Sequence, residues 1–399
     1  MRGLSSSSAA AAAAALVLAF SATAVFAQST TDRIIAHTLA QSHAYDITAH
    51  LADEIGPRLS GSRGADLAVE WTTAKFREWR IAVRNEAVMV PRWVRGAERG
   101  RLISHNNQNI VLTALGGTVA TPSAGITADV VAAGSFEELE RLGRQAIAGK
   151  IVLYTAAMDM NLVRAGDAFA AYSKAVEFRG KGADRASEYG AAAVLVRSVA
   201  SDSLRTPHTG SVRYAGAQKM IPAAAVTAED AMLIDRLLGR GQRVRMHLVL
   251  TPRLLPEVQS ANVVAEIRGR EKPHEIVLIG GHLDSWDLGT GAIDNAAGSA
   301  MVMDTMRTIQ TLGLRPRRTI RAVLYMNEEN GLRGAKAYAR DHAAELPRHA
   351  AALESDAGAT KPVGFRTTLD QPSLDAFTPR FIAPLSRVAA MKFVISEYS

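Results

Sequence analysis

Six side chains in the last third of the sequence have the chemistry of a catalytic site. All are acidic or imidazole groups that come at or soon after apolar runs of strand length, and they are His282, Asp284, Asp294, Glu328, Glu329 and Asp356. In open α/β sheets, ligands collect at the carboxyl ends of the strands. We therefore expect these groups to converge on one crevice, although they are spread from position 282 to position 356.

The residue types indicate a metal site. The sequence contains no cysteine, which excludes disulfides, thiolate ligands and a cysteine nucleophile, so His, Asp and Glu must hold any metal. A neutral imidazole with several carboxylates suits a first-row metal, and zinc above all. One His with three or four acids carries more negative charge than one Zn²⁺ requires, which favours two ions that share a bridging carboxylate.

The spacing suggests separate tasks for neighbouring groups. Asp284 stands two positions after His282 and could accept the other ring N–H of that imidazole. Glu328 and Glu329 are adjacent, so they cannot point the same way from an extended segment. One of them can bind metal while the other acts as a base.

Each of these residues also has an ordinary structural explanation. His-x-Asp is a common pair, Glu-Glu often starts a solvated helix, Asp294 could cap the helix after it, and Asp356 could lie in a turn. Taken singly, these explanations are the more common ones. Taken together, however, residues of these types at successive strand ends favour one metal site, because their shared context is stronger evidence than any single match.

The elements around these residues predict an α/β fold. Apolar runs predict strands at 261–267, 275–280, 319–326 and 350–353, and apolar periodicity predicts helices at 295–312 and 331–342. Alternating strands and helices argue for a mostly parallel, helix-covered sheet. We assign 257–399 to this catalytic domain.

The preceding chain divides into two parts. Residues 28–116, with helical periodicity followed by two predicted strands, form the N-terminal part of the catalytic domain. Turn residues at Gly116-Gly117 then mark a boundary, and 117–256 reads as a smaller inserted α/β module with its own strands and helices. In that module Thr227 is the expected cap of a helix.

Residues 1–27 predict an export signal. Arg2 precedes the apolar run Ala9–Phe20, and small residues end at Ala27, after which cleavage is expected. The run is short for a membrane span of ~20 residues, although an uncleaved anchor stays open. Export without cysteine favours a bacterial periplasm or the medium. The sequence has 46 basic and 39 acidic residues, and the basic ones form no dense run with interleaved aromatic residues. Nucleic-acid binding is therefore not favoured.

Four motifs resemble the di-zinc exopeptidase family that includes bacterial leucyl aminopeptidases, glutamate carboxypeptidase and carboxypeptidase Q. They are Gly-Gly-His282-Leu-Asp284-Ser-Trp286-Asp287, Ala-Ile-Asp294-Asn-Ala-Ala-Gly298, Asn-Glu328-Glu329-Asn-Gly331-Leu-Arg-Gly334 and Glu-Ser-Asp356-Ala-Gly358. The resemblance implies that His282 and Asp356 bind one zinc, that Glu329 binds a second and that Asp294 bridges both. It also implies Glu328 as general base, Asp284 as the residue that orients His282, and a cis peptide bond after Asp294.

Most of the chain resembles the carboxypeptidase Q branch of this family. Gly56–Ser62 and Trp93–Gly96 are similar to its N-terminal part, and the segments around Lys150 and Gly190 resemble a protease-associated domain inserted in the catalytic domain. Whether the insert covers the site or mediates a homodimer stays open.

One departure from the family concerns the second zinc. The resemblance implies a further His some tens of residues after Asp356, but positions 357 to 399 contain none. His342 and His349 are the nearest alternatives, and the simplest interpretation is that the chain lacks the C-terminal part of the domain.

The leading hypothesis is a secreted or periplasmic zinc exopeptidase. It would hydrolyse terminal bonds of peptides or dipeptides with a metal-activated water and Glu328 as the general base. An amidohydrolase acting on small N-acyl compounds would use the same site, and a non-catalytic receptor could retain the fold alone. The sequence does not determine which terminus of a peptide is cleaved.

Overall fold

The computed structural model describes residues 29–200, 205–215, 219–356, 358–360, 362, 364–386, 388 and 392–395. The predicted export signal at 1–27 therefore lies outside the described residues. The described residues form two compact units, a large one within His43–Thr360 and a small one from the described parts of 1–42 and 361–399. In the described part, every helix is too short or too polar to cross a bilayer.

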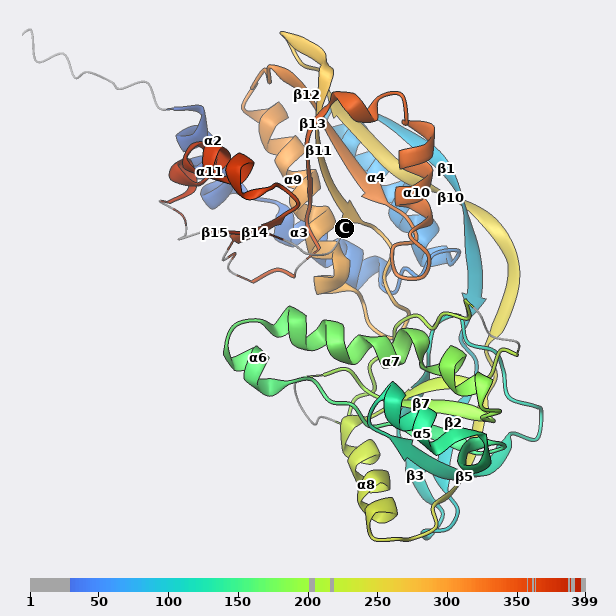
Figure 1. The fold of residues 1–399 in the computed structure, drawn as a ribbon. Helices are drawn as coiled ribbons and strands as arrows, with labels where there is room; N and C mark the ends of the chain where they lie inside the picture. Colours follow the sequence, from blue (N-terminus) through green and yellow to red (C-terminus); the bar gives the residue numbers. More distant parts are fainter. Residues whose placement is uncertain are drawn as a thin grey trace, which may run out of the picture. The chain divides into compact units, whose positions relative to one another are not determined.

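The first sheet of the large unit carries the predicted site. Its strands, in spatial order, are β1 (Ala82–Val94), β10 (Arg253–Ile267), β12 (Arg318–Tyr325), β11 (Lys272–His282) and β13 (His349–Glu354). β12, β11 and β13 are parallel, whereas β10 pairs antiparallel with β12 and with β1 (Figure 1). The expected α/β fold is confirmed, with antiparallel strands added on one side of the parallel ones.

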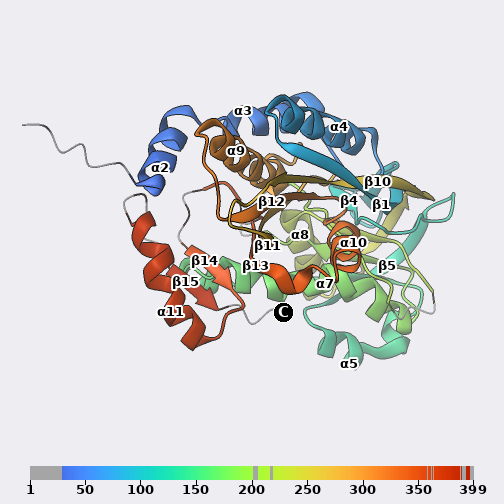
Figure 2. The ribbon, with the colours of Figure 1, turned by 90° about the horizontal axis from the view of Figure 1, so that it is seen from above.

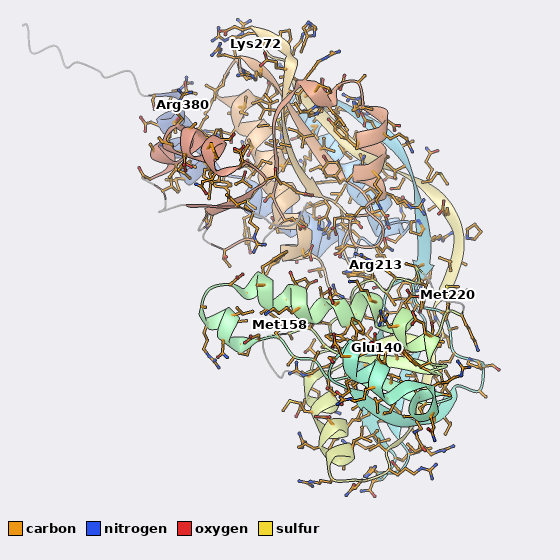
Figure 3. All side chains as sticks on the ribbon, in the orientation of Figure 1. Glu140, Met158, Arg213, Met220, Lys272 and Arg380 are labelled. Carbon is orange, nitrogen blue, oxygen red and sulfur yellow. The ribbon has the colours of Figure 1, made fainter. Side chains whose placement is uncertain are left out.

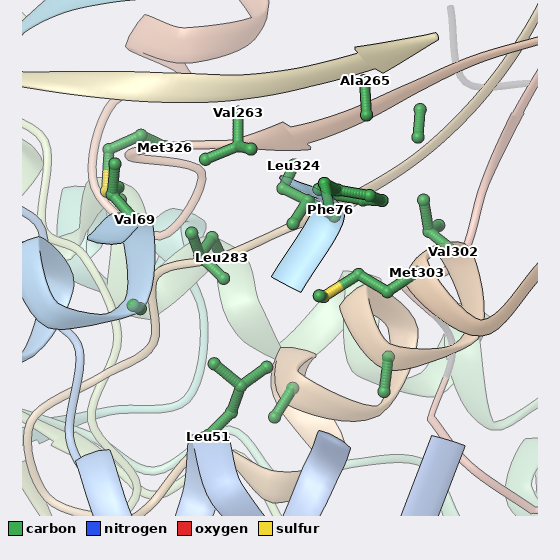
Figure 4. Packing of buried hydrophobic residues seen from close by; sticks show 14 of the residues in the cluster. Leu51, Val69, Phe76, Val263, Ala265, Leu283, Val302, Met303, Leu324 and Met326 are labelled. Atoms are coloured by element: carbon green, nitrogen blue, oxygen red, sulfur yellow. The ribbon is translucent and has the colours of Figure 1, made fainter. Parts of the chain in front are cut away.

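Helices cover both faces of this sheet. α3 (Ala44–Ala49), the π-helix η1 (His50–Ile55), α4 (Arg63–Glu78) and α9 (Ala297–Thr311) lie on one side, and α10 (Arg333–Asp341) on the other (Figure 2). Successive strand residues point to opposite faces, so Val263 packs in the first core cluster and Val264 packs with Tyr338 in another. Phe76 is wholly buried in the first cluster (Figure 4).

A second sheet builds a separate module. Its strands in spatial order are β3 (Gln108–Ile110), β2 (Glu98–Leu102), β9 (Arg245–Leu250), β5 (Ile126–Ala133), β6 (Ile151–Tyr154), β7 (Ala193–Arg197), β8 (Ala223–Val226) and β4 (Leu112–Ala114). Its helices are α5 (Phe136–Ile147), α6 (Met160–Arg164), α7 (Ala168–Glu188) and α8 (Ala228–Gly239), the last capped by Thr227 as expected. We call residues 98–250 the second module.

The second module begins earlier than the boundary expected at residue 117. β4 pairs with β8, and β2 pairs with β9, so strands on both sides of Gly116-Gly117 belong to one sheet. The turn residues lie within the module because these pairings join segments more than a hundred positions apart. Figure 3 shows Lys272, at the start of β11, at the opposite end of the first sheet from Arg213 and Glu140 of this module.

The small unit contains α2 (Thr30–Gln41), β14 (Gly364–Thr367), α11 (Gln371–Ile382), the 3-10 turn η4 (Ala383–Leu385) and β15 (Lys392–Ile395). β14 and β15 pair in parallel. Four aromatic rings pack together beside them, those of Phe365, Phe377, Phe381 and Phe393.

Two glycines allow α9 to start directly against the first sheet. A Cβ on Gly281 of β11 would lie 3.1 Å from the backbone of Gly298, and a Cβ on Gly298 would lie 2.1 Å from both Asn295 Oδ1 and the Ser355 carbonyl oxygen. Asn295 Nδ2 donates to that carbonyl at 2.8 Å, and its Oδ1 accepts the Gly298 N–H at 3.0 Å. The start of α9 is therefore bound to the strand end that precedes Asp356.

Gly298→Ala should destabilise the large unit by about 1–3 kcal/mol, because the new methyl group overlaps the Ser355 carbonyl oxygen and the Asn295 side-chain oxygen, and hydrogen bonds hold both in place. Urea denaturation measures this loss. The matched control is Gly180→Ala in α7, where a Cβ meets no atom within 4 Å and the better helix propensity of Ala should stabilise by up to about 1 kcal/mol. Equal stability of Gly298→Ala and the native protein would contradict the close packing.

Candidate metal centre

The structure brings three of the predicted metal ligands together. His282 is the last residue of β11, Asp294 lies in the π-helix η2 (Ala292–Ala296) before α9, and Asp356 follows β13. One potential ligand atom from each lies within 4.8 Å of the others. His282 Nε2 is 2.9 Å from Asp294 Oδ1 and 3.1 Å from Asp356 Oδ1. The peptide bond between Asp294 and Asn295 is cis, as the resemblance implied.

The three candidate ligands differ in how far they are buried. The His282 side chain has no exposed surface, whereas the side chains of Asp294 and Asp356 are 65% and 40% exposed. The imidazole is therefore fixed inside the protein, and the carboxylates line the open side of the cluster.

A main-chain contact sets the tautomer of His282. Its Nδ1–H donates to the backbone carbonyl of Asp284 at 2.9 Å, while the Asp284 carboxylate lies 3.7 Å away. The expected hydrogen bond to that carboxylate is therefore replaced by one to the carbonyl of the same residue. In the neutral ring, this leaves the Nε2 lone pair facing two carboxylates, which is how a metal-binding imidazole is held.

The Asp284 carboxylate has a different partner. It is wholly buried, and its two oxygens accept the backbone N–H groups of Glu328 at 3.0 Å and Glu329 at 3.4 Å. These bonds fix the loop after β12 against the end of β11. Both glutamates are half-buried there, and Glu329 is not a member of the group of three.

The site concentrates negative charge. Burial, and then the charges of Asp356, Asp284 and Asp294, raise the pKa of Glu328 to about 7. Burial and then the charge of Asp294 raise the pKa of Glu329 to about 9. Burial by itself would lower the pKa of His282, but its acidic neighbours outweigh burial and raise it.

This arrangement fits a zinc ion. An unprotonated Nε2 beside two carboxylate oxygens would leave lone pairs facing one another, so a proton or a cation must stand between them. An imidazole nitrogen with carboxylate oxygens is a donor set that zinc accepts. A divalent cation would also offset the carboxylate charge that, after burial, raises the pKa of Glu328 and Glu329.

Arg58 supports the site and was not singled out from the sequence. Its side chain is wholly buried, and burial lowers its pKa to about 10 against the opposing charges of Asp284 and Glu329. The guanidinium donates at 2.7–3.0 Å to five carbonyl oxygens, those of Leu51, Gly56, Leu283, Thr290 and Gly291. The turn motif around it was visible in the sequence, but the burial of the charge was not.

Asn327 is a second residue that the sequence did not reveal. It is wholly buried with a left-handed φ of 69°, which Asn adopts more readily than most residues. Its Nδ2 donates to Ser60 Oγ at 2.6 Å. This bend directs the chain from the end of β12 into the Glu328-Glu329 pair.

The structure places His342 and His349 in a different polar network. His342 Nε2 lies 3.0 Å from both Glu86 carboxylate oxygens, and its Nδ1 lies 2.9 Å from Glu345. His349 Nε2 is 3.0 Å from the Tyr338 hydroxyl. Neither histidine joins the group of three, so the structure does not support either as the further zinc ligand.

Comparison with known proteins agrees with the site. The model of peptidase family M28 matches residues 262–392. Carboxypeptidase Q of Mus musculus is 36% identical over 329 residues, which cover 82% of this chain and 67% of that protein. The crystal structure of a peptidase M28 precursor from Shewanella amazonensis is 37% identical, with a TM-score of 0.87 over 93% of this chain and 83% of that one.

A more distant structure shares the fold. A zinc aminopeptidase from Bacillus subtilis superposes with a TM-score of 0.60 at 20% identity, over 88% of this chain and 83% of that one. The sequence similarity to carboxypeptidase Q and to the Shewanella protein extends over both sheets of the large unit. The chain therefore belongs to peptidase family M28, whose members are hydrolases that act on peptides.

Proposed function

We propose that this protein is a zinc-dependent exopeptidase that hydrolyses terminal bonds of peptides or dipeptides. The observation that carries the proposal is the cluster of His282, Asp294 and Asp356 ligand atoms within 4.8 Å, beside the Glu328-Glu329 pair. Membership of family M28 and the similarity to carboxypeptidase Q support the reaction class. The zinc aminopeptidase from Bacillus subtilis supports the metal.

The proposed ligand set serves two zinc ions. His282 and Asp356 would hold one, Glu329 would contribute to the second, and Asp294 would serve both. The half-buried position of Glu329, whose N–H contacts the Asp284 carboxylate at 3.4 Å, supports its place beside the cluster. When bound, zinc supplies a Lewis acid that polarises a carbonyl oxygen and makes water more acidic.

Glu328 is the proposed general base. It would accept a proton from the attacking water and return a proton to the leaving amine. Its half-buried position beside the cluster and its backbone bond to Asp284 support this role. Asp284 would act indirectly, since its carbonyl orients His282 and its carboxylate fixes the Glu328-Glu329 segment.

The remaining parts of the chain have proposed roles of their own. The second module would be the protease-associated domain, inserted in a catalytic domain formed by the first sheet and its helices. Residues 1–27 would direct export to the periplasm or the medium and be removed. The apolar run and the small residues before Gln28 support this.

Glu328→Gln should lower kcat by about 10²–10⁴-fold, because the amide cannot accept the proton, while zinc content stays native. The assay is hydrolysis of a panel of dipeptides, longer peptides and N-acyl amino acids. Glu70→Gln, on the exposed face of α4, is the matched control and should keep full activity. Native activity of Glu328→Gln would refute the general base, and cleavage of N-acyl amino acids alone would favour an amidohydrolase.

Removal of metal should abolish hydrolysis, and zinc should restore it. Elemental analysis of the purified protein should give two zinc ions per chain. Asp294→Asn should lose zinc, because the amide is a much weaker ligand than the carboxylate that faces His282 Nε2. A protein that binds no zinc would instead be a binding module that retains the fold.

Expression with the native leader in a bacterial host should yield an exported protein whose first residue is Gln28. N-terminal sequencing of the periplasmic or secreted fraction measures this. A chain that stays in the membrane fraction with Met1 intact would indicate an uncleaved anchor.

A further inference from the structure

The loop between His282 and Asp294 is held by the second module. Trp286, in the middle of this loop, packs against the core of the second sheet. Its ring lies so close to Gly116 that a Cβ there would come within 2.0 Å of Trp286 Cη2. The segment that joins two proposed metal ligands is thus anchored outside the sheet that carries them.

The next residue of the loop, Asp287, forms a bidentate ion pair with Arg95. Asp287 accepts hydrogen bonds from Arg95 Nε at 2.7 Å and from Arg95 Nη2 at 2.8 Å. The Arg95 and Asp287 side chains are only 11% and 22% exposed. A bidentate arginine–carboxylate pair fixes both distance and orientation, and its partial burial limits screening by water and salt.

Arg95 is itself held in place by the second sheet. Its Nη1 donates to Glu98 Oε1 at 2.7 Å, to Thr113 Oγ1 at 2.7 Å and to the Ala114 carbonyl at 2.6 Å. Glu98 Oε1 also accepts the Ala114 N–H at 2.8 Å. These contacts aim the guanidinium at Asp287 and keep its side chain from other conformations.

A second arginine, Arg58, holds the two ends of the same loop. Arg58 donates to the carbonyl of Leu283 at one end, and to those of Thr290 and Gly291 at the other. Arg58 thus fixes where the loop leaves and rejoins the site, and Arg95 fixes its middle. Gly291 is three positions before Asp294, so a shift of the loop reaches that carboxylate.

We propose that Arg95 is a positioning residue for the metal centre. Arg95 lies just before the second module and is bound to its residues Glu98, Thr113 and Ala114. Through the Arg95–Asp287 pair, the second module thus holds the loop in the form that brings the ligand atoms of His282 and Asp294 together. The module is therefore required for metal binding, beyond any role in admitting substrate. This proposal rests on the proposed zinc site.

The test compares two variants that break the pair from opposite ends. Arg95→Lys keeps the positive charge but loses the two parallel donors. Asp287→Asn removes the carboxylate and keeps every contact between Arg95 and the second sheet intact. Each should raise the zinc dissociation constant about 10- to 100-fold, as is typical when an outer partner of a metal site is lost. Competition with a chelator of known affinity measures this zinc dissociation constant. In the metal-free protein, amide hydrogen exchange across 283–291 should become faster.

The double variant and a control separate this effect from general damage. Arg95→Lys with Asp287→Asn should be little worse than either change alone, because both remove one interaction. Arg243→Lys is the matched control. Arg243 Nε contacts both carboxylate oxygens of Asp129 at 3.1 and 3.0 Å within the second module. This change should leave the zinc affinity and the amide exchange of the loop at native values.

Native zinc affinity and native loop exchange in both variants would overturn the proposal. A lower melting temperature with native zinc affinity would overturn it as well, since it would show a merely structural role. If the unaltered protein bound no zinc, the proposed function itself would fail. The exchange comparison in metal-free protein would then still decide whether Arg95 holds the loop.

Discussion

The structure of this site depends on one electrostatic constraint: one imidazole nitrogen must lie about 3 Å from each of two carboxylate oxygens. His282 Nε2 faces Asp294 at 2.9 Å and Asp356 at 3.1 Å, and its other nitrogen is committed to a carbonyl. Such an arrangement is stable only with positive charge between the groups, as a proton or a metal ion. The surrounding fold supplies the rigidity that keeps them together.

Much of that rigidity comes from polar groups buried without solvent. The Asp284 carboxylate is wholly buried and accepts two backbone N–H groups. The Arg58 guanidinium donates to carbonyl oxygens and is attracted by the negative charges of Asp284 and Glu329. Leaving such groups unpaired would cost more than each bond contributes. The loops around the candidate metal centre are therefore held in one conformation, and apolar packing alone would not specify it.

The parallel part of the first sheet explains why distant residues meet. β12, β11 and β13 run in the same direction, so their carboxyl ends lie along one edge, and the close approach of Gly281 and Gly298 brings the start of α9 to the same place. The second module contributes from outside through its contacts with Arg95 and Trp286. The loop between His282 and Asp294 and the second module are thus mechanically linked.

The sequence by itself determined the chemistry and the local elements. The absence of cysteine, the acids and imidazole at strand ends, and apolar runs such as that of β6 all follow from residue types and short-range periodicity. Only the tertiary structure decided that the Asp284 carboxylate accepts the N–H groups of Glu328 and Glu329, that Arg58 is buried, and that the second module starts at Glu98. These features depend on contacts between residues as far as 233 positions apart. Local pattern does not encode which distant groups will meet, since that is set by how the packed elements bury their surfaces and satisfy their polar atoms.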